Sequence, residues 1–162
     1  MTGVEIRAAR DGDWEQIWPF WQRIVLEGET YAYPQDLTSD AARRLWFSQG
    51  TVVVAVDGDR VIGTAATGPN RPGRGSHVAT ASFMVDPDAA GRGVGRALGE
   101  HVLELARRAG YRSMQFNAVV ETNAAAVRLW RSLGFEVIGT VPEAFDHPRY
   151  GFVGLHVMHR RL

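Results

Sequence analysis

The feature that most constrains this chain is a glycine-rich turn between a mostly apolar segment and an amphipathic run. Residues 82–85 are followed by Asp-Pro, and glycines then recur at alternate positions, Gly91, Gly93 and Gly95. Glycines let backbone N–H groups turn inward, and a helix N-terminus adds partial positive charge. The pattern predicts a strand, a loop and a helix start that binds a phosphate or pyrophosphate, although glycine turns also precede helices for steric reasons alone.

Length and composition predict one globular domain, residues 1–162. Hydrophobic residues make up 45% of the chain, and 18 basic residues balance 18 acidic ones, which argues against a nucleic-acid partner. Cysteine is absent, so thiol nucleophiles and disulfides are excluded, and no metal site is expected. The N-terminal residues 1–5 have no signal-like character, and no apolar run is long enough to span a membrane. We therefore expect a cytoplasmic protein without a membrane partner.

Hydrophobic periodicity predicts seven strands and four helices. Their order, β, α, α, β, β, β, α, β, α, β, β, predicts an α/β fold with a central mixed, mostly antiparallel sheet and helices on both faces. A Rossmann domain needs repeated parallel βαβ units and is disfavoured. The expected strands are Val4–Ala8, Thr51–Val56, Val61–Ala66, His77–Val85, Ser113–Val119, Phe135–Val141 and Phe152–His159, and the expected helices are 14–25, 39–49, 94–109 and 123–133.

Some local expectations are more specific. Asp11 and Asp13 are expected to cap the first helix or supply charge to its first turn, and Pro19 is expected to kink or break it. The tryptophan stripe of this helix favours core packing over a ligand cage. Residues 68–75 and 142–150 are expected to be loops.

Two motifs resemble the GCN5-related N-acetyltransferase (GNAT) superfamily, over essentially the whole chain. The first, Ala90-Gly91-Arg92-Gly93-Val94-Gly95-Arg96-Ala97-Leu98, is similar to the family's pyrophosphate loop, Gln/Arg-x-x-Gly-x-Gly/Ala. The second, residues 123–135, is similar to Asn-x-x-Ala-x-x-Leu-Tyr-x-x-x-Gly-Phe. The motifs follow in the family's order, separated by one helix and one strand.

The resemblance implies acetyl-CoA as the cofactor. It implies that the strand before the loop splays from the next strand, that Met84 and Val85 pair with the pantetheine, and that Asn123 helps to hold it. An Asn123 helix cap is compatible with that role. Backbone N–H groups of the loop would bind the pyrophosphate: Gly91, Arg92, Gly93, Val94, Gly95 and Arg96.

Two residues depart from the family's pattern. Ala90 stands where Gln or Arg is usual, so this loop should bind through its backbone rather than through side chains. Trp130 stands where many members have the tyrosine that protonates the departing thiolate. An indole N–H donates a hydrogen bond but is too weak an acid for proton transfer. The usual general acid is therefore absent.

The implied reaction is direct attack of an amine on the thioester in a ternary complex. The candidate catalytic groups are the Val85 N–H, near the thioester oxygen, and Glu121 as the base, with Glu29, His77 and His147 as further titratable groups. For Glu121 and Glu29, an ordinary surface carboxylate is the competing interpretation.

The stretch 116–123, together with Trp130, resembles a subgroup that includes fungal acetyltransferases of proline analogues such as azetidine-2-carboxylate. This resemblance implies that Asn117 faces the substrate and Asn123 the cofactor, and it favours a small amino-acid-like amine. Four aromatic residues are expected to wall the pocket: Tyr31, Tyr33, Phe145 and His147, with Tyr150 beside them.

Alternatives remain open at this stage. A protein or peptide N-acetyltransferase would use the same cofactor in an open groove. A non-catalytic acyl-CoA-binding regulatory module would keep the glycine loop without chemistry, and a nucleotide-binding protein would bind ATP or NAD instead. Family members are often dimers, so a homodimer is also open. The amine acceptor is not identified by the sequence.

Overall fold

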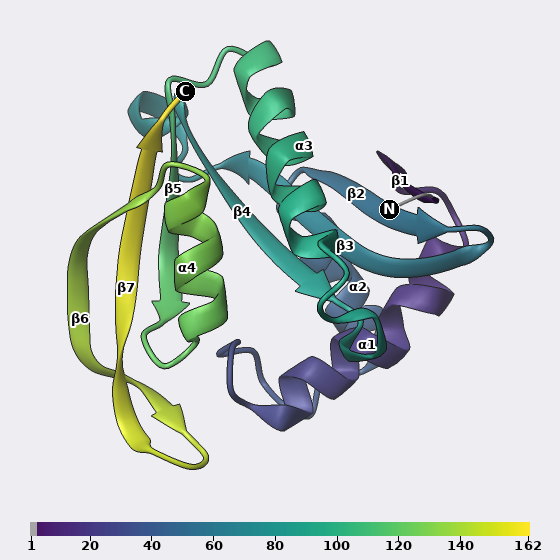
Figure 1. Cartoon of the computed structure of the whole chain (residues 1–162), viewed down its shortest axis with the longest axis horizontal. Helices are drawn as coiled ribbons and strands as arrows, with labels where there is room; N and C mark the ends of the chain where they lie inside the picture. Colours follow the sequence, from purple (N-terminus) through teal and green to yellow (C-terminus); the bar gives the residue numbers. More distant parts are fainter. Residues whose placement is uncertain (1–2) are drawn as a thin grey trace.

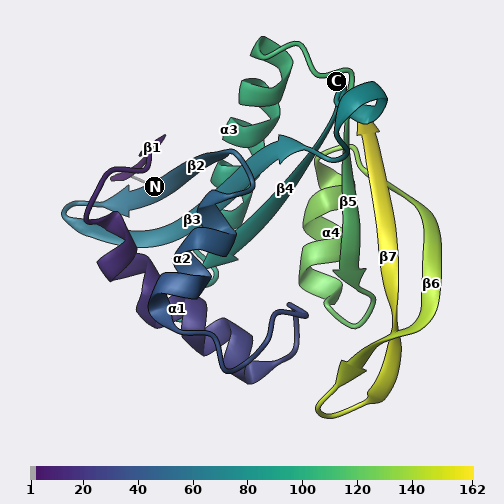
Figure 2. The ribbon, with the colours of Figure 1, turned by 180° about the vertical axis from the view of Figure 1, so that it is seen from behind.

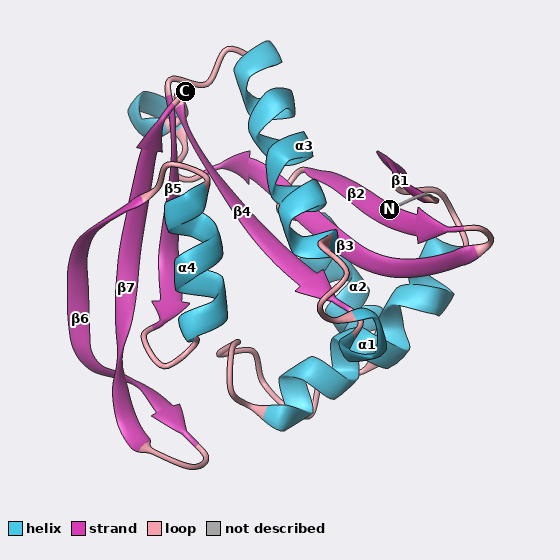
Figure 3. Ribbon diagram, viewed as in Figure 1, coloured by secondary structure: helices cyan, strands magenta, loops and turns pink. Residues whose placement is uncertain are grey.

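The computed structural model describes residues 3–162, so Met1 and Thr2 of the expected domain lie outside the described residues. The strands form one seven-stranded sheet in the order β1-β2-β3-β4-β5-β7-β6 (Figures 1 and 3). The elements are β1 (Val4–Ala8), α1 (Asp13–Glu27), α2 (Ser39–Phe47), β2 (Thr51–Asp57), β3 (Arg60–Pro69), η1 (Gly73–Gly75), β4 (Val78–Val85), η2 (Pro87–Ala89), α3 (Val94–Arg108), β5 (Ser113–Val120), α4 (Ala124–Ser132), β6 (Glu136–His147) and β7 (Gly151–Arg161). The expected α/β fold and its seven strands are confirmed.

Helices cover both faces of the sheet. Helices α3 and α4 lie on the face nearest the viewer in Figure 1, and α1 and α2 lie on the face seen in Figure 2. Strand β2 shows why two layers form, because Val53 and Ala55 join the core under α3 while Val52, Val54 and Val56 join the core under α1 and α2. Side chains that alternate along a strand reach opposite faces, and here both faces are apolar.

Strands β4 and β5 separate along their length. They are parallel neighbours and pair only at Val78↔Ser113 and Ala79↔Met114, whereas every other pair of neighbouring strands is antiparallel. Beyond these residues the two strands fan apart toward the N-terminus of α4 (Figure 1). The splay implied by the resemblance is confirmed.

The start of α1 confirms the expected first-turn charge, Asp13, but not the expected side-chain cap. Gly12 occupies the N-cap with φ 94°, and no side chain caps the helix. Asp13 is the first helical residue, and its carboxylate accepts two hydrogen bonds from the Arg7 guanidinium at 2.8 and 3.0 Å and one from the Arg10 N–H at 2.7 Å. The helix then runs through Pro19 without a break.

The C-terminal hairpin is longer than predicted. Strand β6 continues to His147 through residues expected to form a loop, and β7 begins at Gly151. The irregularity that the sequence assigned to a loop is a register shift inside the strand pair, between Val141 and Phe145, where Glu143 has φ 52°. Phe145, 6% exposed, forms a small core with Val120 and Val153.

Candidate active site

A cleft of about 690 Å³ lies where β4 and β5 separate. One wall is β4, the opposite wall is β5 with α4, and the segment between α1 and α2 closes a third side. The lining residues are Ile24, Glu27, Thr30, Tyr31, Ala32, Tyr33, Ala81, Ser82, Phe83, Met84, Val85, Ala90, Phe116, Asn117, Ala118, Val119, Val120, Asn123, Ala126, Trp130, Phe145 and Leu155. Of the residues predicted for the site, the cleft brings together Met84, Val85, Asn117, Asn123, Trp130, Tyr31, Tyr33 and Phe145.

Strand β4 presents alternate peptide groups to this cleft. The Asp86 N–H donates to Ile62 O of β3 at 2.9 Å. By the period of two, the peptide groups of Met84 also face β3, whereas those of Phe83 and Val85 face the gap left by β5. The free strand edge therefore consists of Phe83 and Val85, and Met84 contributes a side chain that is 2% exposed.

The glycine loop follows β4 at the open end of the cleft. Gly91 and Gly93 both have φ 78°, and Gly93 is the N-cap of α3. The first backbone bond of this helix is from the Ala97 N–H to Gly93 O at 3.0 Å, so the preceding amides of the turn have no helical acceptor. Such a row of amides is a suitable binding site for an anion.

The arginines of the loop are engaged elsewhere in the protein. Arg92 donates to Asp57 at 2.8 Å, and Arg96 contacts Glu100 at 3.4 Å and Ser132 at 2.5 Å. Position 90, where Gln or Arg is usual, is an alanine. The start of the loop therefore places no charged side chain in the cleft. Binding of an anion through the loop backbone stays a prediction.

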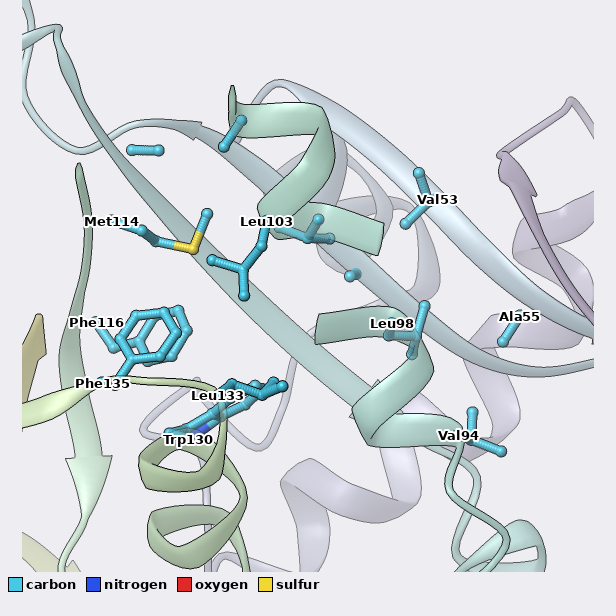
Figure 4. Close-up of a cluster of buried hydrophobic side chains, with 14 of the residues drawn as sticks. Val53, Ala55, Val94, Leu98, Leu103, Met114, Phe116, Trp130, Leu133 and Phe135 are labelled. Atoms are coloured by element: carbon cyan, nitrogen blue, oxygen red, sulfur yellow. The ribbon is translucent and has the colours of Figure 1, made fainter. Parts of the chain in front are cut away.

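Trp130 lies in the wall formed by α4. Its ring is 4.7 Å from Phe83 and 4.8 Å from Phe116, measured between centroids, and it is 7% exposed. Figure 4 shows Trp130 and Leu133 projecting from α4 toward the aromatic pair Phe116 and Phe135. The helices approach closely because α3 has Gly99 at the contact, where a Cβ would lie 2.8 Å from Leu133 Cδ1.

Asn117 lies on the β5 wall within a chain of amides. Its Nδ2 donates to Asn70 Oδ1 at 2.6 Å, and its Oδ1 accepts from Gln115 Nε2 at 2.9 Å. Asn70 comes from the connection between β3 and β4. Asn117 is exposed to the cleft, so its amide is accessible to a small polar molecule.

Tyr31 and Tyr33 form a column of rings against β4. Tyr31 stacks on Tyr33 at 5.3 Å, and Tyr33 stacks on the buried Trp21 at 5.2 Å. The Tyr31 hydroxyl accepts from the Phe83 N–H at 2.8 Å and donates to Phe83 O at 2.6 Å. Burial disfavours the phenolate and raises the pKa of both Tyr31 and Tyr33. Both phenols are therefore neutral near pH 7.

A smaller polar pocket of about 360 Å³ adjoins the cleft and shares Thr30 and Asn123 with it. It contains His147, which was predicted for the main pocket, together with Glu29, Arg149 and Tyr150. His147 is 5% exposed, and its Nδ1 accepts the N–H groups of Arg149 and Tyr150 at 3.1 and 3.2 Å. Its contacts are those of a residue that shapes the β6–β7 turn.

Asn123 has the helix-capping role that its sequence position indicated. Its Oδ1 accepts from the Ala126 N–H at 3.3 Å, at the start of α4. The side chain also lines both pockets, so the capping residue borders the cleft.

Glu121 lies beside the cleft and is not part of its lining. Its Oε1 accepts from the Gly154 N–H of β7 at 2.7 Å, and its own N–H donates to Gly154 O at 3.0 Å. The neighbouring residues Val120 and Leu155 do line the cleft. His77, at the other end of β4, is remote from the glycine loop and also lies outside the lining.

Phe83, Glu27 and Asn70 are among the contributors to the site that the sequence did not predict. Phe83 was overlooked although the alternation along β4 places it on the same edge as Val85. Glu27 lines the cleft from the end of α1, and Asn70 reaches it through Asn117. Neither of the last two carried a signal in the sequence, because their positions depend on how distant segments meet.

The described residues 3–162 also bear on membrane spanning and metal binding. No helix in this range is long and apolar enough to cross a membrane. The same range contains no group of three or more His, Asp or Glu residues arranged to hold a metal ion.

The fold, the split strand pair and the glycine loop define an acetyltransferase-like class, and the comparison with known families agrees. Residues 15–135 match the Acetyltransferase (GNAT) family. The chain belongs to this family.

Particular proteins are similar to it over nearly the whole length. A solved GCN5-related N-acetyltransferase from Kribbella flavida is 57% identical with a TM-score of 0.96, and the match covers 99% of this chain and 98% of that one. The structure of yncA, described as a putative acetyltransferase from Salmonella typhimurium with its cofactor acetyl-CoA, is 28% identical with a TM-score of 0.86, covering 99% and 95%.

Curated relatives are less similar in sequence than the Kribbella flavida protein. The N-acetyltransferase aca1 of Schizosaccharomyces pombe is 31% identical over 72% of this chain and 64% of that protein. The L-amino acid N-acyltransferase MnaT of Escherichia coli is 33% identical over 86% and 84%. The match spans less than two thirds of aca1, and only 14% and 44% of two further relatives.

Proposed function

We propose that this protein is an acetyl-CoA-dependent N-acetyltransferase that acts on the amine of a small, amino-acid-like molecule. The observation that carries the proposal is the edge of β4 that β5 leaves uncovered, where the Phe83 and Val85 peptide groups face a cleft next to the glycine loop. The relatives named as an L-amino acid N-acyltransferase and as L-methionine sulfoximine/L-methionine sulfone acetyltransferases support the substrate class.

The residues present fit acetyl-CoA. The amides of Gly91 to Arg96 would bind the pyrophosphate, and the Val85 peptide would pair with the pantetheine as an added strand pairs with a sheet edge. Asn123 and Trp130, on the opposite wall, would contact the same arm. When bound, acetyl-CoA would supply an activated acetyl group, which would pass to the acceptor amine with the CoA thiolate as the leaving group.

The protein's own groups would position the reactants and manage charge. The Val85 peptide would hold the pantetheine arm next to the acyl group, and Asn117 would bind a polar group of the substrate. The aromatic residues Tyr31, Tyr33 and Phe145 would exclude water from the amine. These roles extend the family assignment to particular residues of this chain.

The amine must lose a proton, and Glu121 is our proposed acceptor. Its Oε1 is committed to Gly154, so the proton would go to Oε2. Val120 and Leu155 border both Glu121 and the cleft, which supports the proposed location. Trp130 would donate a hydrogen bond without transferring a proton.

The proposal is tested by measuring CoA release with acetyl-CoA and a panel of amines: amino acids, amino-acid analogues, simple amines and a lysine-containing peptide. Amine-dependent release with amino-acid-like acceptors is expected. Binding of CoA without release under any acceptor would favour a non-catalytic acyl-CoA-binding module, and release only with the peptide would favour a protein acetyltransferase.

Asn117→Ala locates the substrate within the cleft. Loss of its amide should raise the apparent KM for the amine about tenfold, the effect of losing hydrogen bonds worth about 1–1.5 kcal/mol, with little change in the KM for acetyl-CoA. Gln115→Ala is the companion variant: it removes the hydrogen bond to Asn117 Oδ1 but leaves the Asn117 amide in the cleft, so the KM for the amine should rise less than in Asn117→Ala. Equal changes in both KM values would contradict the assignment of Asn117.

A further inference from the structure

Tyr31 has a hydrogen-bonding arrangement that a packing residue does not need. Its hydroxyl bonds both polar groups of one residue, Phe83, at the strand edge that faces the cleft. Strand β5 has already separated from β4 at this level, so no neighbouring strand supplies those bonds. The phenol therefore occupies the position where a ligand pairing with β4 would arrive.

The position along β4 indicates which part of such a ligand would arrive there. The glycine loop follows the C-terminal end of β4, and Val85 is the first gap-facing residue counted back from it. Phe83 is the next, about 6.8 Å further along an antiparallel strand. A cofactor that enters at the loop and runs back along the edge would pair with Val85 and then bring its acyl end to Phe83.

We propose that the Tyr31 hydroxyl, anchored by the Phe83 N–H, donates a hydrogen bond to the oxygen of the acetyl thioester. This inference rests on the proposed function. A hydroxyl has one proton and two lone pairs, and its proton turns freely about the C–O bond. The Phe83 N–H would remain on one lone pair while the proton turns from Phe83 O to the acyl oxygen.

The surroundings of the phenol suit a donor that stays neutral. Burial raises the pKa of Tyr31, so the proton remains on the phenol throughout the reaction and the group acts by hydrogen bonding alone. An accepted bond from an N–H strengthens the donation of the same hydroxyl. The stack on Tyr33 and Trp21 holds the ring in place, so little reorganisation is needed when negative charge grows on the oxygen.

In this chain Trp130 replaces the tyrosine that usually protonates the leaving thiolate, and the proposal gives Tyr31 a different role. Tyr31 comes from the segment between α1 and α2, on the opposite side of the cleft from α4. It does not replace the proton donor. It stabilises the negative charge that develops on the acyl oxygen, and the thiolate leaves without a proton from the protein.

The test combines binding, spectroscopy and rate on Tyr31→Phe, which keeps the ring stack and removes only the hydroxyl. Acetyl-CoA labelled with ¹³C at the acetyl carbonyl is bound without amine, and the infrared carbonyl band is recorded. The band of the wild-type complex should lie at lower frequency than that of the variant. With the amine, kcat should fall about a hundredfold, the scale of losing one oxyanion donor, while the Kd for acetyl-CoA changes less than about threefold.

Tyr33→Phe is the spectroscopic control, because it removes the neighbouring hydroxyl of the same column. The carbonyl band should keep its wild-type position in that variant. If Tyr31→Phe leaves the band unmoved, or binds acetyl-CoA more tightly with unchanged kcat, the phenol merely fills the empty edge and the inference is wrong. If the wild-type protein fails to bind acetyl-CoA, the proposed function itself has failed.

Discussion

At the level of single residues, Gly91 offers the sharpest test of the anion site. Its φ of 78° is a conformation that L side chains rarely adopt, and its Cβ position is open. Gly91→Val should therefore cost about 1–2 kcal/mol of backbone strain and turn the adjacent amides away from the pyrophosphate. CoA affinity measured by calorimetry should fall at least a hundredfold.

Gly110 provides a matched control for this change. It has φ 86°, equally open surroundings and a position at the far end of α3. Gly110→Val should lose comparable stability in urea unfolding and keep the wild-type CoA affinity. Comparable loss of affinity in both variants would show that strain alone, and not the loop amides, explains the effect.

The role of a residue could be predicted where it depends only on its neighbours in the sequence. Asn123 could be assigned as a helix cap from its place before an apolar run. Tyr31 could be placed near the pocket from its loop, but its bonds to Phe83 span 52 positions. Contacts of that separation depend on the tertiary fold and leave no local pattern.

At the level of elements, the junction of β1 and α1 depends on Asp13 rather than on a helix cap. Hydrogen bonding by Arg7 lowers the pKa of the Asp13 carboxyl. The pair therefore stabilises the folded protein above the usual carboxyl pKa of about 4. This stabilisation is lost as the pH falls through the lower pKa of the folded state. Asp13→Asn should lower the free energy of unfolding by about 1–3 kcal/mol at pH 7.

The difference between wild type and Asp13→Asn should shrink as the pH falls below about 4, which urea unfolding at several pH values measures. Asp11→Asn is the control, because Asp11 is exposed and its nearest atom lies as far as 4.0 Å from the Arg43 guanidinium. It should leave stability unchanged. A difference for Asp13→Asn that persists undiminished in acid would contradict the ionic origin of the effect.

Helices and strands with a clear hydrophobic periodicity were predictable. Elements whose ends depend on contacts with distant parts of the chain were not. The apolar runs of β2 and β3 and the stripe at the start of α3 appear where the sequence placed them. A break at Pro19 was one of the two expected outcomes and is wrong, because packing of Trp14, Ile17 and Trp21 against the core keeps α1 continuous. The end of β6 was missed because Pro142 and Pro148 resemble loop signals, and its pairing with β7 is decided by a register shift.

At the level of the whole molecule, one sheet contains two halves that meet at few strand contacts. Strands β4 and β5 share two paired positions, and the core in which α3 contacts α4 also joins the two halves. The sequence alone predicted the mixed sheet, and the family resemblance was needed to predict the split. A periodic pattern shows which face of a strand is buried, but it does not show where two neighbouring strands part.

A ligand that spans this gap should stabilise the whole domain, because it contacts β4, the glycine loop and α4 together. CoA at a hundred times its Kd should add about 2.7 kcal/mol to the free energy of unfolding, a rise in Tm on the order of 5–10 °C by calorimetry. NAD shares the adenosine and pyrophosphate of CoA but has no pantetheine arm to pair with Val85, so its effect should be much smaller. Gly91→Val should abolish the shift with CoA. An equal shift with NAD would favour the nucleotide-binding alternative, because the split between β4 and β5 would then contribute nothing to recognition.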